Sequence, residues 1–178
     1  MVKNSSHNID LIIEYDWWNR LAEANVADCI NVLNKVCDYL QAQKISAKVD
    51  FVALGKPLSL TLVLSNSEEV RKLNCEFRGI DKATNVLSFA NVDGDDFADV
   101  TANSDYVELG DIIMSGEVLQ NEAEIKSIPP QNHFIHLLVH GILHLLGFDH
   151  QTDAEADFME AIETAVLADM NIDNPYKE

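Results

Sequence analysis

Five segments of the chain have the apolar spacing or the boundary residues that predict helices. The longest pattern runs from Leu21 to Leu40 and places Cys29 and Cys37 on its apolar face, where buried thiols are expected. Ser65 and Glu68 match a capping box, so Ser65 is expected to be the N-cap of the second helix, which should end near Gly79. The remaining helices are predicted at residues 116–125, 130–146 and 153–168.

Four shorter segments are rich in leucine and β-branched residues, which is typical of strands. They are Ile9–Ile13, Leu58–Leu64, Val86–Ala90 and Val107–Met114. The acidic segment Asn91–Ser104 has little apolar pattern and is predicted to be a mobile surface loop. Adjoining strands with separate helices predict an α/β fold of α+β character, in which a mixed, mostly four-stranded sheet is packed by helices.

The composition is that of an ordinary globular protein. The 178 residues suit one domain, expected to span residues 1–178, and 47% of them are hydrophobic. No apolar run of signal-peptide length lies near Met1, and Phe134–Phe148 is shorter than the ~18 apolar residues of a membrane span. The three cysteines form no CxxC motif. These features predict a reduced, cytoplasmic protein without a disulfide framework or a membrane anchor.

Three histidines near the end of the fourth predicted helix carry the clearest chemistry. His140 and His144 are four residues apart, so their side chains leave one helix face about 6 Å apart at their roots. Gly147 is expected to end the helix in a left-handed conformation, after which the chain can bring His150 beside the pair. Three neutral imidazoles leave a fourth tetrahedral position open, as in catalytic zinc sites. We therefore predict a metal centre at these histidines; the alternative is histidines packed in the core.

The spacing H-x-x-x-H-x-x-G-x-x-H is that of the metzincin proteases, with one difference. Those enzymes have a glutamate base after the first histidine, whereas this chain has Gly141, which cannot accept a proton. A packing or access reason is expected for this glycine, because a bare backbone lets substrate or a neighbouring helix come close. His136 shares the helix face but lies about 12 Å along the axis from His144, so it is assigned a structural or supporting role.

Basic residues are concentrated in one part of a strongly acidic chain. The formal net charge is −18, which should repel free nucleic acid unless cations gather locally. Arg71, Lys72, Arg78 and Lys82 are four of the 12 basic residues. Arg78, at a predicted helix end, either interacts with the helix dipole or points into a cleft. Arg71 and Lys72 are equally compatible with a solvated helix face.

Asp111 follows Gly110 inside an otherwise apolar strand, where both residue types are unfavourable. Three interpretations stay open for Asp111: it orients a ligand histidine, it lies near the substrate, or it marks the end of a strand.

Taken together, these segments resemble the YbeY family of rRNA maturation endoribonucleases. The resemblance is carried by HLLVHGILHLLGFDH at 136–150, FRGIDKATNVLSF at 77–89, LGDII at 109–113 and DNPY at 173–176. The HGxLHLxGxDH element is the most specific of these. By position, the resemblance implies one zinc ion held by His140, His144 and His150, and catalytic roles for Arg78 and, less directly, Asp111. The chain departs from the family pattern at Ala90, where members often have proline.

The function implied is zinc-dependent cleavage of single-stranded RNA in the cytoplasm, acting in small-subunit rRNA 3′-end processing and ribosome quality control. Because the chain is acidic, we expect it to reach ribosomal RNA on the small ribosomal subunit through basic ribosomal proteins. Asp149 or the substrate 2′-hydroxyl is the candidate general base. Two alternatives remain: a non-catalytic ribosome assembly factor with structural zinc, and a metzincin-like metalloprotease, which Gly141 disfavours.

Overall fold

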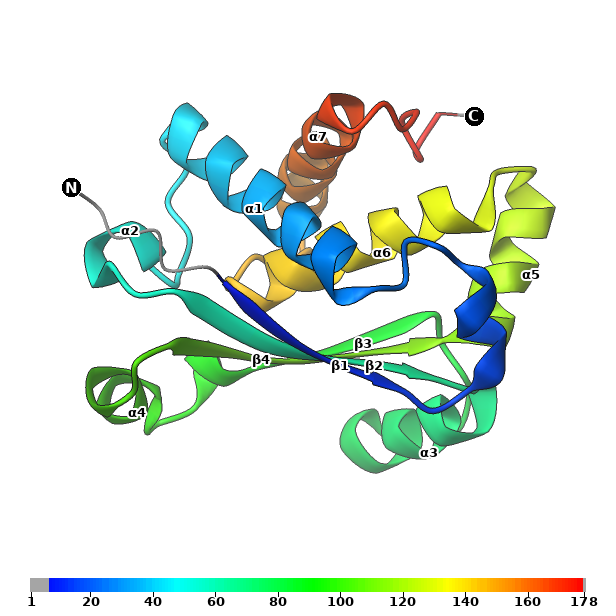
Figure 1. Ribbon diagram of the computed structural model, residues 1–178, viewed down its shortest axis with the longest axis horizontal. Coiled ribbons are helices and arrows are strands. Elements are labelled where there is room, and N and C mark those ends of the chain that lie inside the picture. Colours follow the sequence, from blue (N-terminus) through cyan, green and yellow to red (C-terminus); the bar gives the residue numbers. More distant parts are fainter. Residues whose placement is uncertain (1–6, 178) are drawn as a thin grey trace.

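A four-stranded sheet with the strand order β1-β2-β4-β3 forms the centre of the fold. The structure is a computed structural model that describes residues 7–177 (Figure 1). Strands β1 (Asn8–Ile13), β2 (Leu58–Ser65) and β4 (Val107–Ser115) are parallel, and the edge strand β3 (Val86–Ala90) runs antiparallel to β4. The mixed sheet and its four predicted strands are therefore confirmed.

The central strand β2 shows why this sheet forms a core. Its residues alternate between the two faces of the sheet, so every second side chain points the same way. The four leucines of one face are 0–2% exposed and belong to the main apolar cluster: Leu58, Leu60, Leu62 and Leu64. Burying each such side chain contributes about 1.5–3 kcal/mol, so this face strongly fixes the register of the strand.

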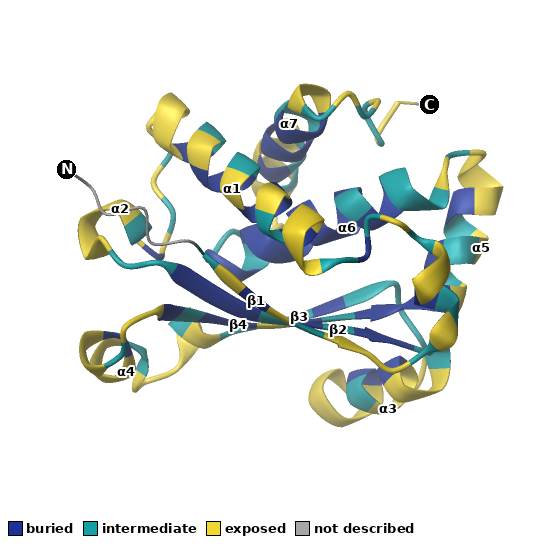
Figure 2. Cartoon of the chain, viewed as in Figure 1, coloured by how far each residue is buried: buried dark blue, intermediate teal, exposed yellow. Residues whose placement is uncertain are grey.

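Three long helices lie above one face of the sheet. Helices α1 (Val26–Gln43) and α6 (Pro130–Leu145) contact the strands, and α7 (Asp153–Asp169) packs against both helices (Figure 1). Helix α6 is buried along most of its length because the sheet and the other two helices surround it (Figure 2). Its apolar residues consequently occupy more than one helix face, and its histidines lie within the protein rather than on an outer surface.

The other elements surround the sheet. Helix α3 (Ser67–Arg78) lies on the face opposite α6 and is largely exposed, and α5 (Gly116–Lys126) follows β4 at one end of the sheet (Figures 1 and 2). The short elements are α2 (Phe51–Leu54), α4 (Phe97–Asn103) and the 3-10 turns Asp16–Arg20 and Asn91–Asp93. In the part of the chain that the structure describes, no helix combines the length and apolar character needed to cross a bilayer.

Two predicted helix starts are wrong by a few residues. Helix α1 begins at Val26 rather than Leu21, because the Asn25 side chain caps it by accepting a hydrogen bond from the Asp28 amide. Helix α3 begins at Ser67 and is capped by Asn66, not by Ser65. Ser65 is still paired with β4 as the last residue of β2, so its backbone belongs to the sheet.

The prediction of a loop over Asn91–Ser104 is also wrong. This acidic segment contains a 3-10 turn and helix α4. The Lys56 ammonium donates hydrogen bonds to the carbonyl oxygens of Thr101, Ala102 and Ser104 at 2.6–3.3 Å. A cation at the carbonyl end of a helix satisfies otherwise unpaired acceptors and interacts favourably with the helix dipole. This long-range contact stabilises a helix whose own sequence shows little amphipathic pattern.

Candidate metal centre

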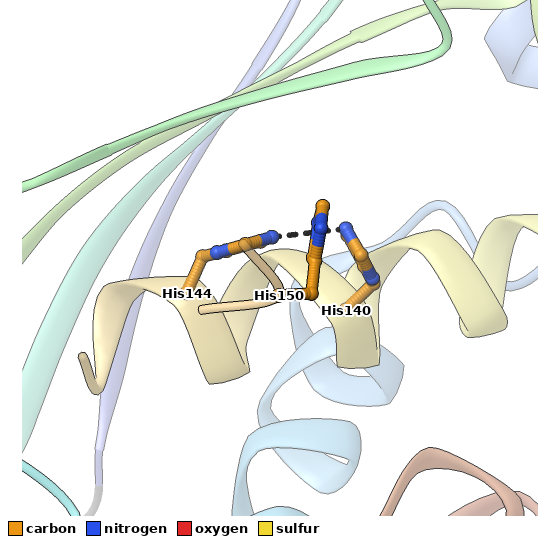
Figure 3. Close-up of side chains that lie close together, drawn as sticks. All are labelled: His140, His144 and His150. Carbon is orange, nitrogen blue, oxygen red and sulfur yellow. Dashed lines mark hydrogen bonds between the residues drawn. The ribbon is translucent and has the colours of Figure 1, made fainter. Parts of the chain in front are cut away.

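The last turns of α6 bring His140 and His144 together, and the following loop adds His150. The Nε2 atoms of His140 and His144 are 3.1 Å apart. One nitrogen from each of the three rings lies within 4.8 Å of the others, and the rings converge above the helix (Figure 3). Gly147 makes this return possible: its φ of +94° is a conformation that L side chains rarely adopt. The predicted convergence of the three histidines is confirmed.

Hydrogen bonds at the opposite ring nitrogens orient both helical histidines. The Nδ1 of His144 donates to the Phe148 carbonyl oxygen at 3.0 Å, and the Nδ1 of His140 lies 2.8 Å from a carboxylate oxygen of Glu163. Neutral rings that donate through Nδ1 present lone pairs at both Nε2 atoms. The two Nε2 atoms are 3.1 Å apart, so both lone pairs can face one metal ion. Tetrahedral zinc would place two such nitrogens about 3.3 Å apart, so this donor set fits a metal ion.

The environment of His144 favours its metal-binding form. Burial, together with the nearby His140 and His150, lowers the pKa of His144 to about 4. The ring is therefore neutral at physiological pH, and a metal ion does not have to displace a proton from it. His150 is exposed, which leaves the centre open to the solvent on one side.

Glu163 on α7 joins two histidines of α6 and was not found from the sequence. Its carboxylate is 1% exposed and accepts hydrogen bonds from His140, from His136 at 2.9 Å and from the Tyr176 hydroxyl. Burial alone would raise the pKa of Glu163, but the hydrogen bonds from these three donors outweigh it and lower the pKa to about 2. The only sequence signal was an acidic residue beside Ile162 on the inner face of α7.

His136 has the supporting role that was predicted for it. It contacts the Glu163 carboxylate and the ring of Tyr176, and it does not belong to the group of three converging imidazoles. Burial lowers the pKa of His136, so its neutral ring donates to the Glu163 carboxylate. His133, one turn earlier, forms a similar pair with Glu122 at 2.7 Å, but this pair does not touch a candidate ligand.

A cleft of about 560 Å³ lies between the histidines and the edge strand β3. Arg78 lines this cleft, so of the two predicted alternatives, interaction with the helix dipole and a position in a cleft, the structure shows the second. Arg71 forms an ion pair with Asp81, and Lys72 pairs with two glutamates of its own helix. Within residues 7–177, by contrast, Arg78 and Lys82 have no carboxylate within 4.0 Å. Of the basic segment, these two cations are thus the ones available to an anionic ligand.

Asp111 is not brought to the histidines. It is exposed on β4, does not line the cleft, and makes no side-chain hydrogen bond to another described residue. The neighbouring Ile112 is buried and contacts α6, so the alternation of the strand directs Asp111 to the opposite face of the sheet. The hydrogen bonds that orient His140 and His144 come from Glu163 and Phe148 instead.

Close packing explains the glycine at position 141, as expected, but the neighbouring element is strand β4 and not a helix or a substrate. A Cβ atom at this position would lie 2.9 Å from the Cδ1 atom of Ile112 and within 3.2 Å of two more atoms of that side chain. Ile112 is fully buried and cannot easily move aside. A side chain at position 141 would therefore point toward β4 and not toward the metal centre.

Asp149 lines the cleft, but its carboxylate is engaged in the loop. One oxygen accepts a hydrogen bond from the His150 amide at 2.8 Å, and the other accepts one from the Gln151 side chain at 2.6 Å. The amide hydrogen bond is the main reason why the pKa of Asp149 is lowered. Such a carboxylate is a weaker base than an ordinary aspartate, and its evident contribution is to hold the loop that carries His150.

The fold and the site define a mixed α/β protein with an open three-histidine candidate metal centre beside a cleft that Arg78 lines. A sequence model described as Endoribonuclease YbeY matches residues 18–171. The chain belongs to the YbeY endoribonuclease family, which confirms the resemblance found in its motifs. Among solved structures, it is similar to TM1509 from Thermotoga maritima, at 18% identity and a TM-score of 0.49, with 96% of this chain and 99% of that chain covered.

Proposed function

We propose that this chain is a zinc-dependent endoribonuclease that cleaves single-stranded RNA during ribosomal RNA maturation. Membership of an endoribonuclease family supports this proposal. The observation that carries it is one cleft lined by three converging histidines and by Arg78, which has no carboxylate partner in the part of the chain described. A phosphodiester group can interact with a metal ion at the histidines and with the guanidinium of Arg78 at the same time.

The residues of the cleft divide the chemistry between them. His140, His144 and His150 would hold the ion, and a divalent metal bound there would supply Lewis-acid polarisation of the phosphate. The guanidinium of Arg78 binds the phosphate and stabilises the additional negative charge of the transition state. The hydrogen bond from the His150 amide lowers the pKa of Asp149, so this carboxylate is a poor general base. Asp111 receives no catalytic role in this proposal, because it lies outside the cleft.

The acidic character of the chain indicates how RNA would reach the cleft. With a net charge of −18, the protein should bind free RNA weakly. We propose that basic ribosomal proteins of the small subunit contact the acidic surface and present the 3′ end of the small-subunit rRNA precursor to Arg78. Such an encounter places the protein in the cytoplasm, where ribosomes mature.

Metal analysis and cleavage assays test the proposal together. Purified protein should contain about one zinc ion per chain, as expected for one three-histidine site, and His140→Ala should remove it. Cleavage of single-stranded RNA should stop after chelation and after Arg78→Ala. Arg71→Ala is the matched control, because Arg71 is paired with Asp81 and does not line the cleft. Cleavage that persists in the chelated protein would overturn the metal-dependent mechanism.

The same variants separate catalysis from assembly. If Arg78→Ala protein still binds small subunits but leaves precursor rRNA unprocessed, the protein acts as a nuclease. If Arg78→Ala supports full processing, the non-catalytic assembly factor is the better description. No observation favours a protease, since position 141 faces Ile112 and offers no base to the centre.

A further inference from the structure

Phe77 is a large aromatic residue with an unusual degree of exposure. It lies in the last turn of α3, and 61% of its surface is accessible to solvent. Its ring packs edge-to-face with Phe89 of β3, with 5.1 Å between the ring centroids and 65° between the ring planes. The pair is therefore restrained from one side, while most of Phe77 remains free for a further contact.

The position of this ring suggests what it contacts. Phe77 and Phe89 line the same cleft as the three histidines, and Arg78 follows Phe77 directly in the chain. An exposed apolar residue alone is common on protein surfaces. An exposed aromatic ring beside an unpaired guanidinium is instead the combination with which proteins hold single-stranded nucleic acid, one group for a base and the other for a phosphate.

A second hollow continues from this cleft. It has a volume of about 630 Å³, lies between α3 and α5, and shares Arg78, Thr84 and Asn85 with the cleft as a common wall. Lys82 lines this hollow and has no carboxylate partner within residues 7–177; Glu117 and Glu122 also line it, and their carboxylates accept hydrogen bonds from Ser67, Asn85 and His133. The two unpaired cations of the basic segment thus lie along one continuous surface that begins at the histidines.

We propose that Phe77 is a stacking platform for a nucleobase of single-stranded RNA, adjacent to the phosphate held at the histidines, and that the strand continues past Arg78 toward Lys82. This inference rests on the proposed function and adds a subsite to it. Arg78, which lines both hollows beside the exposed ring of Phe77, favours RNA over an uncharged peptide as the occupant. Because every base has a flat π surface, a single platform of this kind tolerates any sequence.

Fluorescence of 2-aminopurine, which is quenched by stacking, tests the contact directly. Metal-loaded protein is mixed with short 2′-O-methyl RNAs that carry the probe at successive positions, and gel electrophoresis confirms that the RNAs stay intact. We expect quenching at one position, and we expect Phe77→Leu to abolish it and to weaken binding about 5- to 100-fold. Phe77→Trp should restore both. Tyr106→Ala is the control, since this exposed aromatic residue lines neither hollow.

The outcomes distinguish this inference from the proposed function. If the wild-type protein binds and cleaves RNA while Phe77→Leu binds with unchanged affinity and quenching, only the stacking platform is overturned. If the wild-type protein neither binds nor cleaves RNA, both proposals fall. If RNA cleavage persists while Phe77 mediates binding of an apolar peptide instead of RNA, only the stacking platform falls. An abasic site at the quenched position should weaken binding to the wild-type protein as much as Phe77→Leu does, which tests the contact without altering the protein.

Discussion

Replacing Glu163 by glutamine tests how the metal centre is held in place. The substitution keeps the size of the side chain but removes its charge and one of its two acceptor oxygens. In the structure the carboxylate accepts from His140 at 2.8 Å, from His136 at 2.9 Å and from the Tyr176 hydroxyl. The amide nitrogen of glutamine would face at least one of these donors, so one donor loses its acceptor in a site that is 1% exposed.

The expected magnitude follows from these contacts. Loss of the carboxylate lowers the basicity of the His140 ring and releases its orientation, which typically costs 10- to 100-fold in metal affinity. This corresponds to about 1.4–2.8 kcal/mol of binding free energy. In the metal-free protein, one unsatisfied buried donor should lower the free energy of unfolding by about 1–3 kcal/mol.

Competition with a chromophoric zinc chelator measures the affinity, and urea denaturation measures the stability. Glu122→Gln is a matched control. Glu122 on α5 accepts a hydrogen bond from His133, which lies on α6 as His140 does, but Glu122 touches no candidate ligand. We expect Glu122→Gln to bind zinc as the wild-type protein does. The reasoning is refuted if Glu163→Gln binds zinc within about twofold of wild type, or if both variants lose the same affinity.

Three further predictions concern other parts of the fold. Cys75 is exposed, whereas burial raises the pKa of Cys29 and Cys37 to about 12, so a disulfide reagent should modify one thiol rapidly and two slowly. Three fast thiols would contradict the packing of α1. Gly110 has a φ of +125°, and a Cβ there would lie 2.0 Å from a backbone oxygen of β3, so Gly110→Ala should lower the unfolding free energy. We expect a loss of about 2–4 kcal/mol in urea denaturation, and a loss below about 1 kcal/mol would refute this. The pKa of His144 is lowered, mainly by burial, from 6.5 to about 4, so the unfolded chain binds more protons between these values. The metal-free protein should therefore lose stability as pH falls through this window, and a melting temperature that rises on acidification would count against it.

Features that depend on neighbouring residues in the chain could be predicted from the sequence. The four strands followed from short runs of β-branched and leucine residues. All five predicted helices are present, four of them with both ends within two residues of the prediction, whereas the short helices α2 and α4 were not predicted. The pair His140 and His144 needed only the geometry of one helix, and the return of His150 needed only a glycine that ends that helix. These properties are local, because the backbone geometry of a few residues decides them.

Contacts between distant elements could not be predicted in this way. Helix α4 is stabilised by hydrogen bonds from Lys56. The N-cap of α3 is Asn66 and not the predicted Ser65, because Ser65 pairs with β4. Glu163 joins the site only when α7 packs on α6, 23 residues after His140 in the sequence. No periodic pattern encodes such a meeting, because it depends on how whole helices pack.

The sequence by itself thus determined the candidate ligand set and the family, since both are contained in short motifs. Only the tertiary structure decided which charges are free to act. Arg71 and Arg78 look alike in the sequence, but the first is neutralised by Asp81 while the second lines the cleft. Asp111 adjoins the buried Ile112, yet strand alternation turns it away from the site. The physical reason is that the function of a charged group depends on its partners, and packing alone assigns those partners.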